Sequence, residues 1–187
     1  LAGAFLVISV SAYYVLKKRD LDFAKSSLKI GLVVGTIAVF LQAFLGHLSG
    51  QIVAKYQPSK LAAFEGLYQT EKGASLSIIG LVNAKEKKMD YSLEIPSLLS
   101  FLAFNDFTAE VKGLDQFPEQ DWPNVPVVFQ VYHLMLFTWV WMFVTLLIAF
   151  FKWWKGSLFN SKICLNLLVF SVFAPQIGNQ AGWVAAE

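Results

Sequence analysis

Residues 126–151 read PVVFQVYHLMLFTWVWMFVTLLIAFF and contain no Asp, Glu, Lys or Arg. About 20 residues of α-helix cross the hydrocarbon core of a bilayer, so this run alone predicts a membrane-spanning helix. Three further apolar runs lie at 1–16, 28–49 and 163–187. With 56% hydrophobic and 15% charged residues, the chain has the composition of a membrane protein. The expected fold class is an all-α transmembrane helix bundle.

The two outer runs are expected to be incomplete spans. The run at 1–16 is short for a span, begins at Leu1 and has no initiator Met. The run at 163–187 ends at Glu187, directly after apolar residues and without a polar tail. We therefore expect a fragment with four spans, of which the first and the last are truncated.

Charge divides the connecting segments into two kinds. Segments 17–27 and 152–162 are basic, and the positive-inside rule places both in the cytoplasm. Segment 50–125 has more acidic residues than lysines and is expected to be periplasmic or extracytoplasmic. The net charge is only +2 and the basic residues lie beside spans, so we expect no nucleic-acid partner.

The outer segment 50–125 is predicted to contain its own structure. A helix begins near Ser59 and ends near Gly66 or Gly73, because good helix formers follow the serine. Short strand-like runs at 75–82 and 91–95 suggest a hairpin, and Pro96 opens another short helix through Ala103. A loop this long is more often functional than a plain connector.

Ligand-capable side chains within spans are candidates for function because they are costly in hydrocarbon. Met135, Trp139 and Met142 share one face of the 126–151 helix, so Met135 could bind a haem iron. Core packing is the commoner role for such a stripe. His133 lies about 200° around the helix from Met135, so the two cannot approach one iron from the same side.

Two histidines and one cysteine complete this group. His47 and His133 lie at similar depths near the outer ends of their spans and could ligate a haem together; hydrogen-bonded interfacial histidines are the alternative. Cys164 is alone, which excludes a disulfide framework and predicts a small core residue.

The 163–187 helix carries a polar stripe. Gln180, Trp183 and Glu187 recur at helical spacing beyond Pro175, where we expect a kink. A carboxylate within the membrane is protonated, paired or metal-bound, whereas Glu187 at the far interface would simply be solvated.

In the outer segment, Lys60 and Glu65 are five residues apart, or about 140° on a helix. They are therefore expected to face different partners. A solvated helix face is the ordinary explanation for such residues.

The stretch QPSKLAAFEG (57–66) resembles the quinol-binding loop of cytochrome bd oxidase subunit I. Five other stretches resemble that family in the same order, so the resemblance covers essentially the whole chain: SAYYVLKKRD (11–20), IPSLLS (95–100), EVKGL (110–114), FQVYHLM (129–135) and AGWVAAE (181–187).

The resemblance implies a respiratory quinol:oxygen oxidoreductase that reduces O2 to water and builds proton motive force without pumping. It implies a low-spin haem b (b558), a high-spin haem b (b595), and haem d or a third haem b. Met135 matches an axial ligand of the low-spin haem and Glu187 an axial ligand of the high-spin haem. Trp183 would pack near the haems. His133 would lie beside the haem without binding its iron. Lys60 and Glu65 match the catalytic pair for quinol oxidation, and Gln57 joins them in binding the substrate.

The implied setting is the bacterial inner membrane. The implied substrates are ubiquinol or menaquinol and O2, and the implied partners are subunit II and a small single-span subunit. At the position of His133 many family members carry arginine, and at that of His47 many carry aspartate. Two alternatives stay open: a bis-histidine b-type cytochrome that uses these two histidines, and a cofactor-free transporter or structural bundle.

Overall fold

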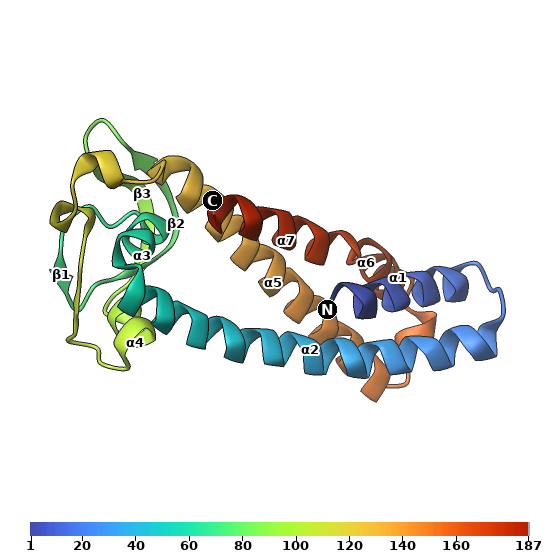
Figure 1. Cartoon of the computed structure of the whole chain (residues 1–187). Coiled ribbons are helices and arrows are strands. Elements are labelled where there is room, and N and C mark those ends of the chain that lie inside the picture. The colour runs from blue at the N-terminus through green and yellow to red at the C-terminus, as the bar shows by residue number, and fades with distance from the viewer. Residues whose placement is uncertain (187) are drawn as a thin grey trace. The chain divides into compact units, whose positions relative to one another are not determined.

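The computed structural model describes residues 1–186 and is mostly helical (Figure 1). Three helical stretches in this range are long and apolar enough to cross a membrane. They are α2 (Leu21–Tyr56), α5 (Val125–Trp154) and the pair α6 (Lys162–Phe170) and α7 (Phe173–Ala186). Helix α1 (Ala2–Leu16) is apolar but has only 15 residues, short of a full span.

The chain divides into two compact units. Unit 1 comprises Leu1–Ala43 and Met135–Gln180, and unit 2 comprises Phe44–Leu134 together with the residues that follow Gln180. Helices α2, α5 and α7 therefore contribute residues to both units. Each unit has its own buried core, and each is described here by itself.

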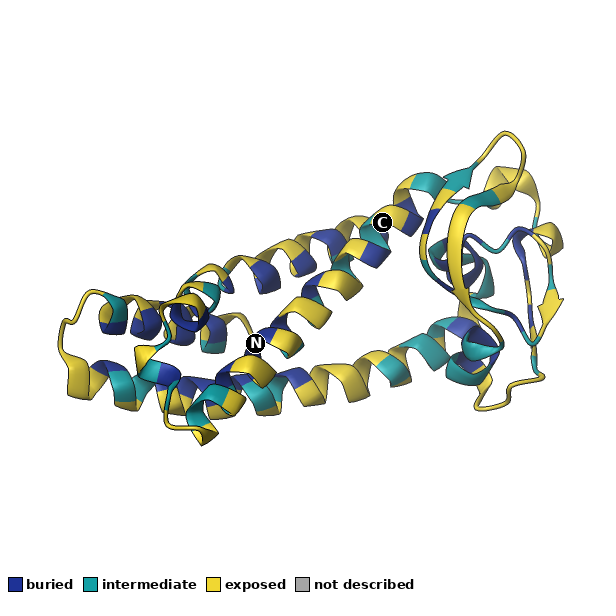
Figure 2. Cartoon of the chain, turned by 180° about the vertical axis from the view of Figure 1, so that it is seen from behind, coloured by how far each residue is buried: buried dark blue, intermediate teal, exposed yellow. Residues whose placement is uncertain are grey.

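Unit 1 is a packed set of apolar helices. Phe5 and Ile8 of α1 are fully buried in its core. The α1–α2 contact is close: a Cβ built on Gly31 or Gly35 would lie 3.0 Å from the Ile8 side chain. Many large apolar residues on these helices are nevertheless exposed (Figure 2), as expected of helices whose outer faces meet lipid. Cys164 is buried in this core, as predicted.

Helix α2 is longer than the apolar run at 28–49. It begins at Leu21, so Lys25 and Lys29 lie within the helix, and only a short turn remains of segment 17–27. Long lysine side chains can extend from a helix end toward the polar interface, which lets a helix continue past its apolar run. Both lysines lie over the ring of Phe159, in the 3-10 turn Leu158–Asn160. The two basic segments thus meet at the same end of unit 1.

Residues 162–186 form two helices, and the break between them precedes the proline. Helix α6 ends at Phe170, and α7 begins at Phe173, so Pro175 lies in the first turn of α7. The kink expected at Pro175 is therefore displaced toward the N-terminus. A proline is tolerated in the first helical turn because the N–H groups there have no intrahelical acceptor.

Unit 2 corrects the all-α expectation, because it contains two small antiparallel sheets. The predicted hairpin is present as β2 (Leu76–Asn83) and β3 (Lys88–Ile95). A second pair, β1 (Glu71–Lys72) with β4 (Glu110–Val111), gave no pattern in the sequence because each strand has only two residues. The remaining elements are α3 (Pro58–Glu65), α4 (Leu98–Phe104) and the 3-10 turns Leu114–Gln116 and Glu119–Asp121.

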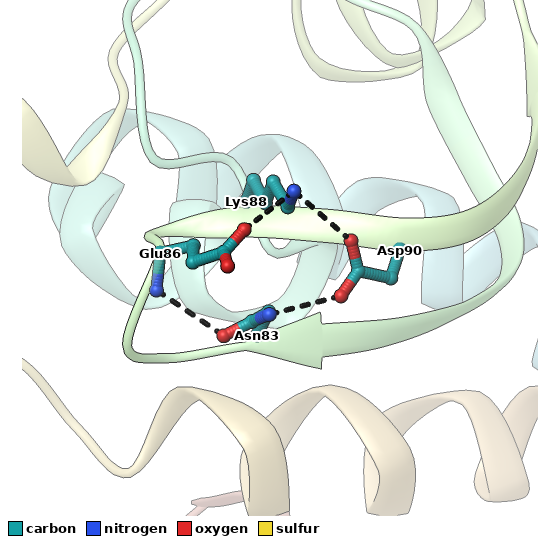
Figure 3. A network of polar contacts seen from close by, with 4 residues as sticks. All are labelled: Asn83, Glu86, Lys88 and Asp90. Carbon is teal, nitrogen blue, oxygen red and sulfur yellow. Dashed lines mark hydrogen bonds and ion pairs between the residues drawn. The ribbon is translucent and has the colours of Figure 1, made fainter.

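The turn of the β2–β3 hairpin is held by a polar network (Figure 3). The Asn83 side chain donates to Asp90 at 3.0 Å and accepts from the backbone N–H of Glu86 at 3.2 Å. Lys88 pairs with Glu86 at 2.5 Å and with Asp90 at 3.6 Å. These exposed contacts fix the turn and lie among the polar residues that separate the two predicted strands.

Candidate functional site

Helix α3 carries the two charged residues that the sequence analysis singled out in the outer segment. Pro58 lies at its start, where a missing N–H costs nothing, and Gly66 ends it in the left-handed conformation with φ +63°. The predicted helix is confirmed, and of its two predicted ends the one at Gly66 is correct. Its start lies slightly earlier than expected, so that Ser59 is within the helix. Lys60 and Glu65 lie on different faces of this helix, in agreement with their spacing.

Glu65 is buried, with only 4% of its surface exposed. Burial raises the pKa of its carboxyl from 4.5 to about 8, while a hydrogen bond from the Ser77 backbone acts in the opposite direction. Its Oε2 atom has no hydrogen-bond partner among the described residues. A solvated helix face is therefore the wrong description of Glu65. A carboxyl in this setting exchanges a proton near neutral pH.

An aromatic stack joins α3 to α5. The Phe64 ring stacks on Tyr132 of α5, with ring centroids 4.4 Å apart and planes within 4°. Tyr132 is close enough to Glu65 for the two to interact electrostatically. The carboxyl thus lies in apolar surroundings of the kind that disfavour its charged form.

Lys60 lies at a cavity on the other face of α3. Its Nζ donates a 2.7 Å hydrogen bond to the Ala186 carbonyl, in the last turn of α7, where carbonyls have no helical partner. The cavity has a volume of about 460 Å³. Its polar lining comes from Gln57, Ser59, Lys60 and Asp121, and its other lining residues are Tyr56, Pro58, Phe117, Pro123, Val128, Ala185 and Ala186. An ammonium group has three N–H donors, so Lys60 can still bind a hydroxyl or carbonyl oxygen.

The structure therefore separates the predicted quinol-binding residues. Gln57 and Lys60 line the cavity, and Glu65 is not among its lining residues. A molecule in the cavity would contact the lysine and not the carboxyl. The two residues are suited to different tasks, one to binding and the other to holding a proton.

His133 of α5 is buried, and both of its ring nitrogens have partners. Nδ1 lies 2.9 Å from the carbonyl oxygen of Phe129, and Nε2 lies 2.7 Å from that of Ser77. The ring also stacks on Phe129 at 4.0 Å. A carbonyl oxygen lies within hydrogen-bonding distance of each nitrogen, so neither nitrogen faces an open position for an iron.

This geometry argues against the bis-histidine alternative. His133 uses both nitrogens on backbone carbonyls, and Nε2 of His47 lies 3.2 Å from the Gln51 side chain, one turn further along α2. Each histidine fits the other interpretation that the sequence left open, that of a hydrogen-bonded histidine near the membrane interface.

The two methionines on the α5 stripe have different surroundings. Met142 is 3% exposed and belongs to the core of unit 1, so its sulfur serves in packing. Met135 is only partly buried, and its backbone carbonyl accepts from Thr138 at 2.7 Å. Unlike Met142, it is not a member of the buried core of unit 1.

A haem fits this donor set. Haem iron takes one or two axial ligands from the protein, so a single partly exposed methionine is suited to it, whereas most other metal sites need several ligands. Within residues 1–186, no group of three or more His, Cys, Asp or Glu side chains is arranged to hold a metal ion. Trp183 is 62% exposed on α7 and is free to pack against a flat ring. Glu187 lies outside the described residues.

Three residues of this region were missed by the sequence analysis: Ser77, Gln130 and Tyr132. Gln130 precedes His133 by one helical turn, and that spacing was a usable signal for a shared partner. Ser77 acts through its backbone, which the side-chain type does not reveal.

Apolar helices long enough to cross a bilayer, together with a folded segment that buries a carboxyl, define a membrane protein with a buried ionisable group. Similarity to known proteins shows to which family of membrane proteins the chain belongs. The family model for "Cytochrome bd terminal oxidase subunit I" matches residues 1–187, and the chain belongs to that family.

Individual relatives agree with the family. A provisionally assigned cytochrome bd menaquinol oxidase subunit I of Bacillus subtilis (strain 168) is 35% identical over 100% of this chain and 43% of its own length. The cytochrome bd ubiquinol oxidase subunit 1 of the same organism is 29% identical over 99% of this chain and 42% of its own. The solved bd oxidase from Geobacillus thermodenitrificans superimposes with a TM-score of 0.85 and 30% identity, covering 99% of this chain and 43% of that one. The chain thus spans less than half the length of these relatives.

Proposed function

We propose that this chain is the quinol-oxidising part of subunit I of a terminal oxidase that transfers electrons from quinol to O2. The carrying observation is Glu65, a buried carboxyl with one unpartnered oxygen and a pKa of about 8, in a chain of the cytochrome bd subunit I family. Perturbed ionisable groups of this kind are typical of sites that transfer protons.

Quinol oxidation to quinone releases two electrons and two protons, and the protein must accept the protons. Glu65 is suited to this because its pKa lies close to neutral pH, so that it can take up a proton and release it again. The Ser77 backbone donor stabilises the ionised form before the proton arrives, and the surrounding apolar residues favour the protonated form afterwards.

Lys60 and Gln57 bind the polar headgroup in this proposal. Both line the cavity of about 460 Å³, and Lys60 can donate to a quinol oxygen while it also bonds to Ala186. The relatives' names differ in the quinol, menaquinol in one and ubiquinol in the other, so either substrate is compatible with the proposal.

Met135 would hold the low-spin haem b and Glu187 the high-spin haem b, with Trp183 packed beside them; a third haem, d or b, would bind elsewhere. Haem iron, when bound, carries the electrons singly from quinol toward O2. The thioether of Met135 is a soft ligand that favours the reduced iron, which suits an electron acceptor for quinol.

The proposed setting is a bacterial cell membrane with segment 50–125 outside and both basic segments in the cytoplasm. The contacts of Lys25 and Lys29 with Phe159 support a common side for the two basic segments. Protons from quinol would then leave outside, and charge would cross the bilayer without pumping. Subunit II and a small single-span subunit are the proposed partners.

The test is quinol oxidation by the complete oxidase carrying Glu65→Gln, with Glu71→Gln as the matched control. Glu71 lies in the same outer segment but is exposed. We expect Glu65→Gln to lower kcat by about 10² or more, since a positioned proton acceptor contributes that much. Glu71→Gln should have little effect, and the haem spectrum of both variants should be unchanged. Normal turnover by Glu65→Gln would contradict the proposal.

A cofactor-free transporter or structural bundle is the competing function. Purified complete protein without a haem Soret band would decide for it. A reduced-minus-oxidised optical spectrum with haem b bands would exclude it.

A further inference from the structure

Two side chains of α5 bond to the backbone of strand β2. Gln130 donates from Nε2 to the Gly80 carbonyl at 3.0 Å, and His133 places Nε2 2.7 Å from the Ser77 carbonyl. Gln130 and His133 are three residues apart and therefore share one face of the helix. Helix α5 is thus joined to β2 at two points within unit 2.

The pairing of β2 with β3 is irregular at this contact. The register shifts between Ser77 and Ile79 and again between Ile79 and Leu81. In a regular strand, carbonyls three residues apart point to opposite edges, so Ser77 and Gly80 could not both face α5. The irregularity turns both carbonyls toward the helix, and bulges that redirect backbone groups in this way are common beside functional sites.

Ser77 connects this contact to Glu65. The backbone N–H and C=O of one residue in an extended strand point to the same edge. A partner that fixes the Ser77 carbonyl therefore also fixes its N–H, which serves the Glu65 carboxyl. Glu65 has no other partner on its second oxygen among residues 1–186, so this single backbone donor matters more than usual.

We infer that His133 is a positioning residue for Glu65, because it holds Ser77 of β2 so that the Ser77 N–H meets the carboxyl. The inference rests on the proposed role of Glu65 as proton acceptor. His133 acts through the backbone of β2 and touches neither substrate nor carboxyl in this role. Tyr132 of α5 interacts electrostatically with Glu65, and Glu94 of β3 is paired with Ser77. The other titratable groups on the elements around this contact are Lys60 of α3 and Lys88, Asp90 and Tyr91 of β3.

The test compares two amides at position 133 in the complete oxidase, by the pH dependence of kcat/KM for quinol. His133→Gln keeps an N–H donor with the reach of Nε2, and His133→Asn has the same chemistry one methylene shorter. We expect His133→Asn to move the rising limb about one pH unit upward, and so to lower kcat/KM about tenfold at neutral pH, since a lost donor disfavours the carboxylate. His133→Gln should restore the wild-type profile. Each variant must retain the haem spectrum.

Gln130→Ala is the matched control, because it removes the neighbouring α5–β2 bond at Gly80 and leaves Ser77 untouched. It should keep the wild-type pH profile. An equal shift in Gln130→Ala and His133→Asn would overturn the inference, since general loosening of β2 would then explain both. An unshifted His133→Asn beside an inactive Glu65→Gln would also overturn it, and would leave the proposed function standing. An active Glu65→Gln would instead refute the proposed function itself.

Discussion

The two units of this chain bury different kinds of polar group. In unit 1 the buried polar residues are serines and threonines, and several of them donate to helix carbonyls, such as Ser9 to Val169 and Ser171 to Leu168, both at 2.7 Å. In unit 2 they include an ionisable carboxyl, Glu65, and a histidine, His133, whose ring nitrogens each lie close to a backbone carbonyl. A hydroxyl satisfied in this way costs little to bury, whereas a carboxyl changes its proton affinity.

The two units therefore differ in character: unit 1 is an apolar scaffold, and unit 2 contains the buried ionisable groups. Unit 1 supplies apolar helices and the partly buried Met135, while in the proposed function unit 2 would supply the residues that bind a quinol headgroup and accept its protons. Substitutions in unit 1 should therefore affect haem binding or stability, and substitutions on α3 should affect turnover and its pH dependence.

The largest expected effect is on the methionines of α5. Met135→Leu should abolish the low-spin haem b signal in the reduced-minus-oxidised spectrum, because leucine has no donor atom. Met142→Leu should keep the signal and cost less than about 1.5 kcal/mol of stability, as volume-conserving core changes do. Loss of the signal in Met142→Leu alone would show that the two methionines have been assigned the wrong way round.

The pH dependence of quinol oxidation should follow Glu65. A carboxyl with a pKa of about 8 is protonated below that pH, so its ionised, proton-accepting fraction falls about tenfold per pH unit. kcat/KM should therefore rise with pH and level off above about 8, and the residual rate of Glu65→Gln should lack this limb. A limb near pH 4.5 would mean that the carboxyl is solvated in the working enzyme.

Lys60 should give a different kinetic result from Glu65, because it lines the cavity and Glu65 does not. Lys60→Gln should raise KM for quinol by about tenfold, the loss of one charge-assisted hydrogen bond, with a smaller change in kcat. Steady-state kinetics with a soluble quinol would measure both. A pure kcat effect would place Lys60 in the chemical step.

Helix packing in unit 1 should be sensitive to one glycine. A Cβ on Gly178 of α7 would collide with Oγ1 of Thr138 on α5. Gly178→Ala should therefore destabilise the protein by about 1–3 kcal/mol, measured as a lower Tm. Gly46→Ala on α2, where a Cβ meets nothing within 4 Å among the described residues, is the control and should be neutral or slightly stabilising.

The smallest effect is expected in the hairpin turn of unit 2. Lys88 pairs with Glu86 and Asp90, but all three groups are substantially exposed. Lys88→Ala should change stability by less than about 1 kcal/mol, as surface ion pairs usually do, with turnover unchanged. A large loss of turnover would indicate that the hairpin tip itself binds a partner.

Local sequence signals predicted much of this fold. The glycine that ends α3, the strand-like runs of the hairpin and the apolar runs all act over a few residues, so they could be interpreted without tertiary structure. The serine cap expected at Ser59 was wrong, because α3 already begins at Pro58. Helix ends within α2 could not, because lysines at a helix end are as compatible with a loop as with a helix. The break before α7 was not predicted for a similar reason, because a proline such as Pro175 is as compatible with the start of a helix as with a kink.

The sequence predicted several residues that make up the candidate site, but it did not predict how they are arranged in space. Spacing alone put Lys60 and Glu65 on different faces, but only tertiary packing decides that one face is open and the other buried. The proposed role of Ser77 involves an irregularity in β2 that lies at its contact with α5, and the bonded residues are 50 and 56 positions apart in the sequence. Long-range backbone contacts of this kind leave no mark in residue type.

The most direct measurement is the infrared spectrum of the Glu65 carboxyl in the intact oxidase as a function of pH, with Glu65→Gln as the blank. A protonated-carboxyl band that is present at pH 6, is lost with a midpoint near pH 8 and is missing from the variant is the predicted result. A wild-type spectrum identical to that of the variant at pH 6 would mean that Glu65 is already ionised there, and would contradict its role as a buried proton acceptor.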